Sequence, residues 1–281
     1  MSTTEPRTAM PTAATAAQAN HLRALHHAEE PLVLANVWDP MSALLVAEAG
    51  AAAVATTSGG VAWAHGLPDG EHLPIEPMLD VVAAIAGAMD VPVSADVEGG
   101  YGDVAATVAA VVERGAAGIN LEDRVGDGLR SAEDQAARLG AARDAGAALG
   151  VEVVINARTD VFLAPGGSRS IDEVADRATT YAEAGADCLF VPGVVDVATV
   201  AQIVERCPLP VNVMAGPGAP TVAELAAVGV RRISVGGALA QAAYGAARAA
   251  ARELLGPGTY GSLDAAPSFA ELNALVTGRI R

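Results

Sequence analysis

The chain has 281 residues, of which 52% are apolar, and this length suits one large α/β domain with a buried core. Acidic residues outnumber basic residues by 33 to 17, so we expect no nucleic-acid partner and no binding to an anionic membrane surface. All 17 basic residues are arginine. The absence of lysine excludes Schiff-base aldolases, pyridoxal-phosphate enzymes and P-loop nucleotide enzymes, each of which needs a lysine amine.

The first 20 residues have neither the basic start nor the apolar centre of a signal peptide, and we expect a disordered lead-in there. No apolar run of about 18 residues occurs, so no membrane-spanning helix is expected. Cys188 and Cys207 form no CxxC motif, which argues against a disulfide scaffold or a structural zinc site. These features together predict a cytoplasmic protein.

From residue 21 to residue 255, short β-branched runs alternate with alanine-rich helical segments. This alternation predicts a (β/α)₈ barrel of the TIM type, because eight strands fit the available length. The expected strands are Leu32–Trp38, Ala53–Ser58, Pro92–Val97, Gly118–Glu122, Glu152–Arg158, Cys188–Pro192, Pro210–Met214 and Arg232–Gly236. An open doubly wound sheet is the alternative, but no GxGxxG motif follows an early strand.

Five of the predicted helices end at a glycine that a strand follows directly. Glycine readily adopts the left-handed conformation that closes a helix, so these positions predict αβ turns. They are Gly50, Gly115, Gly150, Gly185 and Gly229. Residues 256–281 break the pattern with a Gly/Pro-rich connector and an amphipathic helix from about Ser268. So short a helix must bury its apolar side on its own barrel or on a neighbouring subunit.

Carboxylates gather at the expected carboxyl ends of the strands, where barrels of this type carry their active sites. Asp96, Glu98 and Glu122 follow adjacent strands, and Asp69 lies in the loop after the second strand. Converging carboxylates repel one another unless a cation or an arginine neutralises them. All-oxygen ligation favours Mg²⁺, with Mn²⁺ as a possible substitute. The alternative is that some of these acids cap helices or pair with arginines.

Arg158 ends a predicted buried strand and would project into the mouth of the barrel. Its planar fork suits bidentate binding of a substrate carboxylate or phosphonate. A purely structural ion pair with Asp160 or Glu122 is nearly as good an explanation.

Three backbone amides and two titratable side chains complete the candidate site. Ser58, Gly59 and Gly60 would offer N–H groups to an anion, although the glycines could equally serve only the turn. His65 and Tyr101 could transfer protons, whereas a lone loop histidine is more often a surface residue.

These segments resemble the isocitrate lyase/phosphoenolpyruvate mutase superfamily. The resemblance covers about residues 32–237 in the expected order, through the segments NVWDPMSALLVAEAGAAAVATTSGGVAWAHGLPD, PVSADVEGGYG, AGINLED, VVINARTD and PVNVM. It implies a (β/α)₈ barrel whose terminal helix is exchanged between the subunits of a homodimer or homotetramer. It also implies that Asp96 binds Mg²⁺ directly, and that Asp69, Glu98 and Glu122 hold the water molecules of the ion.

The resemblance further implies that residues 58–60 hold the carboxylate of a small 2-oxo or 2-hydroxy acid. Trp38 would lie against this carboxylate, and Arg158 and Asn212 would contact the other end of the substrate. The intermediate shared by most members of the superfamily is a metal-bound enolate.

One loop departs from the superfamily pattern. After Glu122-Asp123 the chain reads RVGDGLRSAEDQ, without the KKCGH-type segment of the isocitrate lyases or the lysine- and asparagine-bearing loop of the mutases. The remaining groups predict an Mg²⁺-dependent carbon–carbon lyase that acts by decarboxylation or retro-aldol cleavage. One alternative is a phosphorus–carbon mutase or hydrolase acting on a phosphonopyruvate-like acid. The other is a barrel that binds a carboxylate without turning it over.

Overall fold

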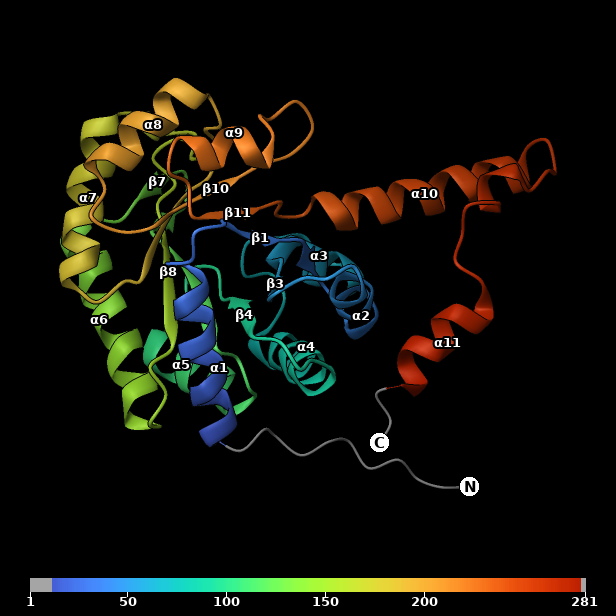
Figure 1. Cartoon of the computed structure of the whole chain (residues 1–281), viewed down its shortest axis with the longest axis horizontal. Helices are drawn as coiled ribbons and strands as arrows, with labels where there is room; N and C mark the ends of the chain where they lie inside the picture. Colours follow the sequence, from blue (N-terminus) through green and yellow to red (C-terminus); the bar gives the residue numbers. More distant parts are fainter. Residues whose placement is uncertain (1–11, 279–281) are drawn as a thin grey trace.

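The computed structural model describes residues 12–278, in which a ring of parallel strands is surrounded by helices (Figure 1). The strands follow the order β1-β11-β10-β9-β8-β5-β4-β3-β2, and every neighbouring pair is parallel. They are β1 (Leu32–Leu34), β2 (Asn36–Val37), β3 (Val54–Thr56), β4 (Val93–Asp96), β5 (Gly118–Glu122), β8 (Val154–Arg158), β9 (Cys188–Val191), β10 (Val211–Met214) and β11 (Arg232–Ser234). The predicted TIM-type barrel is confirmed.

The ring has nine strands instead of eight because the first predicted strand is interrupted at Ala35. Its first part, β1, pairs with β11, whereas its second part, β2, pairs with β3. The side chain of Asn36 bridges the gap between them. Its Nδ2 donates to the carbonyl of Thr56 at 3.1 Å, and its Oδ1 accepts the N–H groups of Val235 and Gly236, both at 3.0 Å. A side chain thus makes the contacts that the interrupted backbone ladder lacks.

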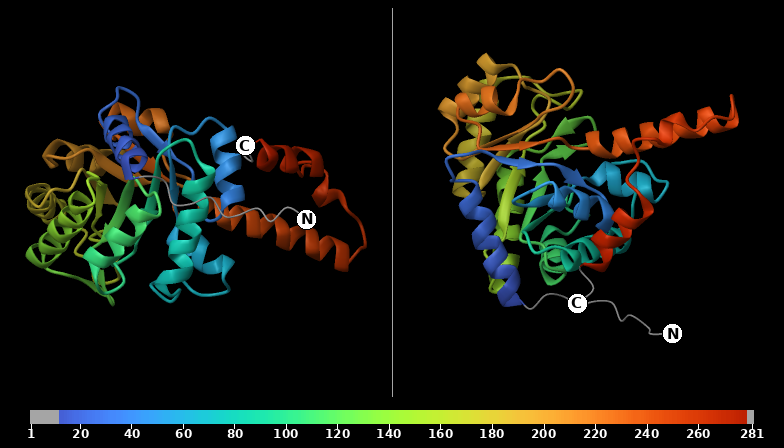
Figure 2. Two further views of the ribbon diagram at one scale, coloured as in Figure 1. Left: turned by 90° about the horizontal axis from the view of Figure 1, so that it is seen from below. Right: turned by 45° about the vertical axis from the view of Figure 1, so that its right-hand side comes forward.

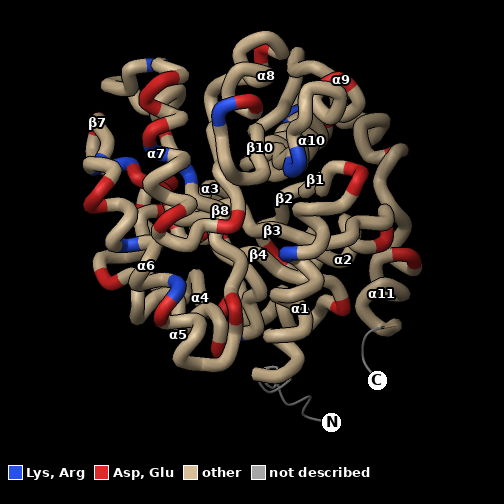
Figure 3. Tube along the Cα trace, turned by 60° about the vertical axis from the view of Figure 1, so that its left-hand side comes forward, with Lys and Arg blue, Asp and Glu red and all other residues tan. Residues whose placement is uncertain are grey.

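Most of the helices cover the outside of the ring. The α-helices of the described chain are α1 (Thr12–Leu25), α2 (Pro40–Glu48), α3 (Ser58–Ala64), α4 (Ile75–Ala88), α5 (Val104–Glu113), α6 (Ala132–Ala148), α7 (Ile171–Glu183), α8 (Val197–Arg206), α9 (Val222–Ala227), α10 (Ala238–Leu255) and α11 (Phe269–Thr277). The five predicted turn glycines all have positive φ angles, between 73° and 95°, which confirms the αβ turns. Acidic positions are spread over the outer helices (Figure 3). None of the helices within residues 12–278 combines the length and hydropathy that crossing a membrane requires.

Helix α1 begins earlier than the sequence suggested. The lead-in expected through residue 20 is helical from Thr12 onward, because Ala19 and Leu22 bury their side chains completely against the barrel. A Cβ atom at Gly118 would lie 2.7 Å from the side chain of Leu22, so this glycine lets α1 approach the start of β5. Residues 1–11 lie outside the described part of the chain.

The chain after the last strand leaves the barrel. Helix α10 projects away from the ring and the chain then turns back, so that α11 lies against α2 (Figures 1 and 2). Within α10 only Ala240 is buried. We call residues 238–278 the C-terminal arm. Large apolar side chains remain exposed along it, namely Leu254, Leu255, Tyr260, Leu263 and Phe269.

Candidate active site

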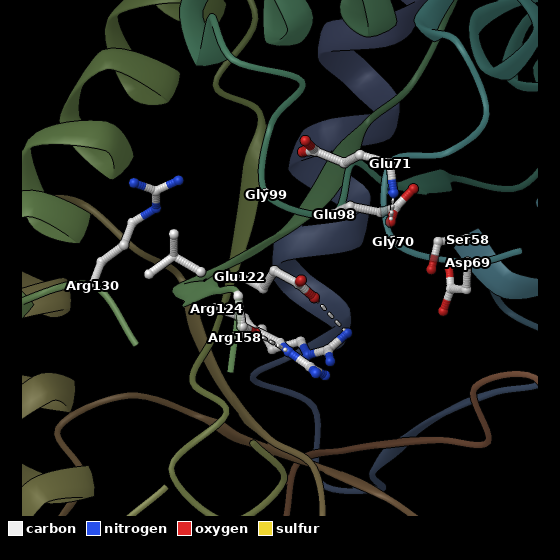
Figure 4. Close-up of a pocket in the computed structure, with 12 residues that line it drawn as sticks. Ser58, Asp69, Gly70, Glu71, Glu98, Gly99, Glu122, Arg124, Arg130 and Arg158 are labelled. Atoms are coloured by element: carbon white, nitrogen blue, oxygen red, sulfur yellow. Dashed lines mark hydrogen bonds and ion pairs between the residues drawn. The ribbon is translucent and has the colours of Figure 1, made fainter. Parts of the chain in front are cut away.

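Two adjoining cavities open at the carboxyl ends of the strands. The larger, about 490 Å³, is bordered by the hairpin of β6 (Arg124–Val125) and β7 (Gly128–Leu129), and we call it the hairpin cavity. The smaller, about 210 Å³, lies over the centre of the ring beside Asp96, and we call it the central cavity. Ser58, Asp69 and Arg158 line both cavities. Figure 4 shows the hairpin cavity.

The predicted carboxylates come together around these cavities. Asp96 lines the central cavity, Glu98 and Glu122 line the hairpin cavity, and Asp69 borders both. Asp96 accepts hydrogen bonds from the backbone N–H groups of Ser58 and Glu98, both at 3.2 Å. Glu98 has a left-handed backbone with φ 51°, a strained conformation of the kind that collects at functional sites.

Two further contacts hold Glu98. Its Oε1 accepts the hydroxyl of Tyr101 at 3.0 Å, and its Oε2 accepts the backbone N–H of Glu71 at 2.6 Å. The side chain therefore has a fixed orientation at the edge of the hairpin cavity.

Burial makes these acids difficult to ionise together. Desolvation raises the pKa of Asp96, and it raises the pKa of Glu98 to about 7, with the charge of Asp96 adding to the effect. Desolvation raises the pKa of Glu122 to about 8, because the attraction of Arg158 only partly offsets burial and the repulsion of nearby acids. A cation placed among them would favour the ionised forms.

The donor set fits a hard divalent cation. Within residues 12–278, no three His, Cys, Asp or Glu side chains already form a compact metal-binding cluster. The four acids that face the two cavities nevertheless offer only oxygen atoms, the ligands that Mg²⁺ and Mn²⁺ prefer. Asp69 is exposed and lies in a loop, so its position can adapt to an ion.

Arg158 is held by two carboxylates. Asp160 binds its Nε at 2.6 Å and its Nη2 at 2.9 Å, and Glu122 contacts Nη1 at 2.8 Å. The guanidinium also lies 5.8 Å from the ring centre of Phe190. The ion pairs weighed as an alternative are therefore present. They do not hide the side chain, since Arg158 lines both cavities.

Asp123 is a completely buried hydrogen-bonding centre behind the site. Its Oδ1 accepts the backbone N–H of Asp160 at 3.0 Å, and its Oδ2 accepts the Tyr181 hydroxyl at 2.8 Å and Nη1 of Arg177 at 3.1 Å. The same Nη1 donates to the carbonyl of Arg130 at 2.9 Å, and the N–H of Arg130 donates to the Asp123 carbonyl at 2.8 Å. Helix α7 thus fixes both the tip of β8 and the base of the hairpin.

Six of the predicted site residues line neither cavity. They are Trp38, Gly59, Gly60, His65, Tyr101 and Asn212. His65 closes α3, and its Nδ1 lies 2.9 Å from the carbonyl of Val61, one turn back along the helix. Tyr101 stands behind Glu98 and donates to it, so it supports a carboxylate instead of facing the cavity. The structure thus brings neither predicted proton-transfer group to the site.

Asn212 is completely buried because it lies two residues before the end of β10. Met214, at the strand end, reaches the central cavity in its place. The glycines serve close packing of α3. A Cβ atom at Gly60 would lie 2.9 Å from the Cβ of Trp38, and one at Gly59 would lie 3.3 Å from Oδ2 of Asp69.

Sequence reasoning missed two arginines, Arg124 and Arg130, which both line the hairpin cavity. The signal was present in RVGDGLR, where a Gly-Asp turn between Val125 and Gly128 connects the two short strands of the hairpin. Arginines at both ends of such a hairpin would lie near Glu122, which lies two residues before it.

Comparisons with known proteins identify the family of the chain. A family model described as phosphoenolpyruvate phosphomutase matches residues 22–255. An uncharacterized protein of Mycobacterium tuberculosis is 36% identical over 229 residues, which cover 81% of this chain and 86% of its own. The 2-methylisocitrate lyase of Escherichia coli is 32% identical over 197 residues, 65% of this chain and 64% of the lyase.

Solved structures share the fold. A Burkholderia cenocepacia protein described as a candidate lyase or mutase superposes with a TM-score of 0.88 and 38% identity, over 94% of this chain and 98% of its own. A phosphonopyruvate hydrolase solved with oxalate and Mg²⁺ superposes with a TM-score of 0.83 and 25% identity, over 94% of this chain and 96% of the hydrolase. The chain therefore belongs to the phosphoenolpyruvate phosphomutase family, within the isocitrate lyase/phosphoenolpyruvate mutase superfamily of lyases, mutases and hydrolases.

Proposed function

We propose that the protein is an Mg²⁺-dependent lyase that breaks a carbon–carbon bond in a small 2-oxo or 2-hydroxy carboxylic acid. The observation that carries this proposal is the arrangement of four oxygen-donor acids and one arginine around two adjoining cavities. Family members at least 30% identical to the chain include 2-methylisocitrate lyase and oxaloacetate decarboxylase, whose names describe such cleavage.

The acids have separate tasks in this proposal. Asp96 would bind the cation directly, and Asp69, Glu98 and Glu122 would hold its water molecules. A divalent cation held by these acids would supply Lewis-acid stabilisation of negative charge on the substrate. Mn²⁺ could take the same ligands.

Arg158 would orient the substrate. Asp160 fixes two of its nitrogen atoms, so the guanidinium is preorganised with Nη1 on the side of Glu122. An arginine held in this way can stabilise negative charge that develops on the substrate without having to reorient. Neither cavity is lined by a cysteine, a histidine or a lysine, and in this proposal water supplies the proton to the product.

Proton NMR of the purified full chain tests this proposal. The protein is incubated with Mg²⁺ and a panel of oxaloacetate, malate derivatives, isocitrate, methylisocitrate and phosphonopyruvate, beside a matched sample with a chelator. Chelator-sensitive growth of a pyruvate-type product from a carbon acid is the expected result. Consumption of phosphonopyruvate alone would establish phosphorus–carbon chemistry instead. Metal-dependent line broadening without consumption would establish a carboxylate-binding barrel.

We also propose that two or four chains assemble by exchanging the C-terminal arm. An apolar groove of about 630 Å³ lies beside β1 and α2, where Val33 and Leu45 are partly exposed, and Leu239 at the start of α10 borders it. Leu239 thus places the start of α10 at this groove. From there α10 leads away from the barrel (Figure 1). The arm of a second copy has the exposed apolar side chains that could fill the groove. Both cysteines are free, which suits the cytoplasmic location that we propose.

A further inference from the structure

Arg124 is the one arginine of the hairpin cavity that has no acidic partner in the described part of the chain. Arg158 is held by Glu122 and Asp160, and Arg130 pairs with Asp134 at 3.4 Å. Within residues 12–278, the guanidinium of Arg124 makes a single hydrogen bond, in which its Nε donates to the carbonyl of Gly126 at 3.1 Å. This contact fixes the side chain within its own hairpin and leaves both Nη groups available to a ligand.

The position of Arg124 decides which cavity its two Nη groups can serve. Its side chain is half-buried and lines the hairpin cavity together with Glu122 and Arg158. In Figure 4, Ser58 and Asp69 stand on one side of this cavity and the hairpin residues stand on the other. A ligand whose first carboxylate lies near Ser58 would therefore extend past Arg158 toward the hairpin and bring its other end to Arg124.

The chemistry of the guanidinium defines what that end should be. Two parallel N–H groups match the oxygen pair of a carboxylate, and a partly enclosed cavity strengthens such charge-assisted bonds. A neutral amide of the same size offers one oxygen instead of two and carries no charge. An unpaired arginine beside a substrate cavity thus selects for an anionic group.

We propose that Arg124 is a specificity-determining residue that binds a second carboxylate of the substrate, so that the enzyme prefers dicarboxylic acids to their monocarboxylic analogues. This inference rests on the proposed function, in which Arg158 orients the substrate. It assigns a role to the hairpin that follows Glu122 and Asp123.

Matched ligands and matched variants test the inference in the full-length protein with saturating Mg²⁺. Malate and oxaloacetate are each compared with the corresponding 4-amide by isothermal titration calorimetry. We expect the wild type to bind each dicarboxylate at least about tenfold more tightly than its amide. Arg124→Gln should lower the affinity for the acids to that for the amides and leave the affinity for the amides unchanged. Arg206→Gln, which removes an exposed arginine paired with Asp172 on the outer helices, is the control.

The possible outcomes separate this inference from the proposed function. Equal binding of acid and amide by the wild type would overturn the inference, and so would unchanged acid binding by Arg124→Gln. A variant that loses acids and amides alike would also overturn it, because that result indicates general damage to the cavity. If the acid preference depends on Arg124 but NMR of the same samples shows no cleavage product, the inference stands and the proposed lyase activity is rejected.

Discussion

Replacing Tyr181 by phenylalanine should destabilise the protein from a position outside the cavities. Tyr181 is completely buried, and its hydroxyl donates to Oδ2 of Asp123 at 2.8 Å and accepts from Nη1 of Arg177 at 3.0 Å. Phenylalanine has the same ring, so the substitution removes these contacts without opening a large cavity. Asp123 then keeps its buried carboxylate with one donor fewer.

The size of the effect follows from the charge of that partner. Burial already raises the pKa of Asp123, and the hydrogen bonds from Asp160 and Tyr181 oppose this rise. A hydrogen bond to a charged group contributes about 1.5–3 kcal/mol. We therefore expect Tyr181→Phe to lower the free energy of unfolding by about 2 kcal/mol.

Urea unfolding followed by circular dichroism measures this change, at one protein concentration for all variants. Tyr244→Phe is the matched control, because Tyr244 is exposed and its recorded contact is a tilted ring pair with Trp38. The control should leave the unfolding midpoint unchanged. If Tyr181→Phe is as stable as the control, Asp123 does not depend on this hydroxyl, and our account of the buried centre is wrong.

Three further predictions concern separate parts of the chain. Burial lowers the pKa of His26 from 6.5 to about 4, so the unfolded chain binds a proton there that the folded chain does not. His26 therefore contributes a loss of about 3 kcal/mol in stability as the pH drops from 6.5 to 4, and urea titrations should show that the wild type loses about this much more stability over that range than His26→Gln does. Asp96→Ala should weaken Mg²⁺ binding more than about 100-fold by calorimetry, and unchanged binding would exclude it as the direct ligand. Phe269→Asp should shift sedimentation toward the monomer with an unchanged circular dichroism spectrum, whereas an unchanged mass would argue against arm exchange.

The barrel could be predicted from the sequence because its signals are local. Each strand is a short buried run, and five of the helices end at a glycine whose left-handed backbone the chain requires there. Such signals depend on residues a few positions apart, so they can be recognised without knowledge of the rest of the fold. The extra strand could not be predicted, because the break at Ala35 is bridged by Asn36 through contacts with the distant residues Val235 and Gly236.

Some residues of the candidate site could likewise be assigned from the sequence, and others could not. Asp69, Asp96, Glu98, Glu122 and Arg158 could be assigned to the mouth, because parallel strands bring their carboxyl ends to one face. The positions of Asn212, His65 and Tyr101 relative to the cavities could not be read from the sequence, because packing decides where a strand ends and which way a side chain points.

The sequence by itself determined the fold class, the family resemblance and the oxygen-donor character of the site. The tertiary structure decided which side chains share a cavity and which have partners. Arg124 lies two residues after Glu122 in the sequence, and Arg158 lies opposite Glu122 on the neighbouring strand. Only the folded chain shows that one is saturated by carboxylates and the other is not. The reason is physical, because ion pairing depends on distances of a few ångströms that sequence separation does not fix.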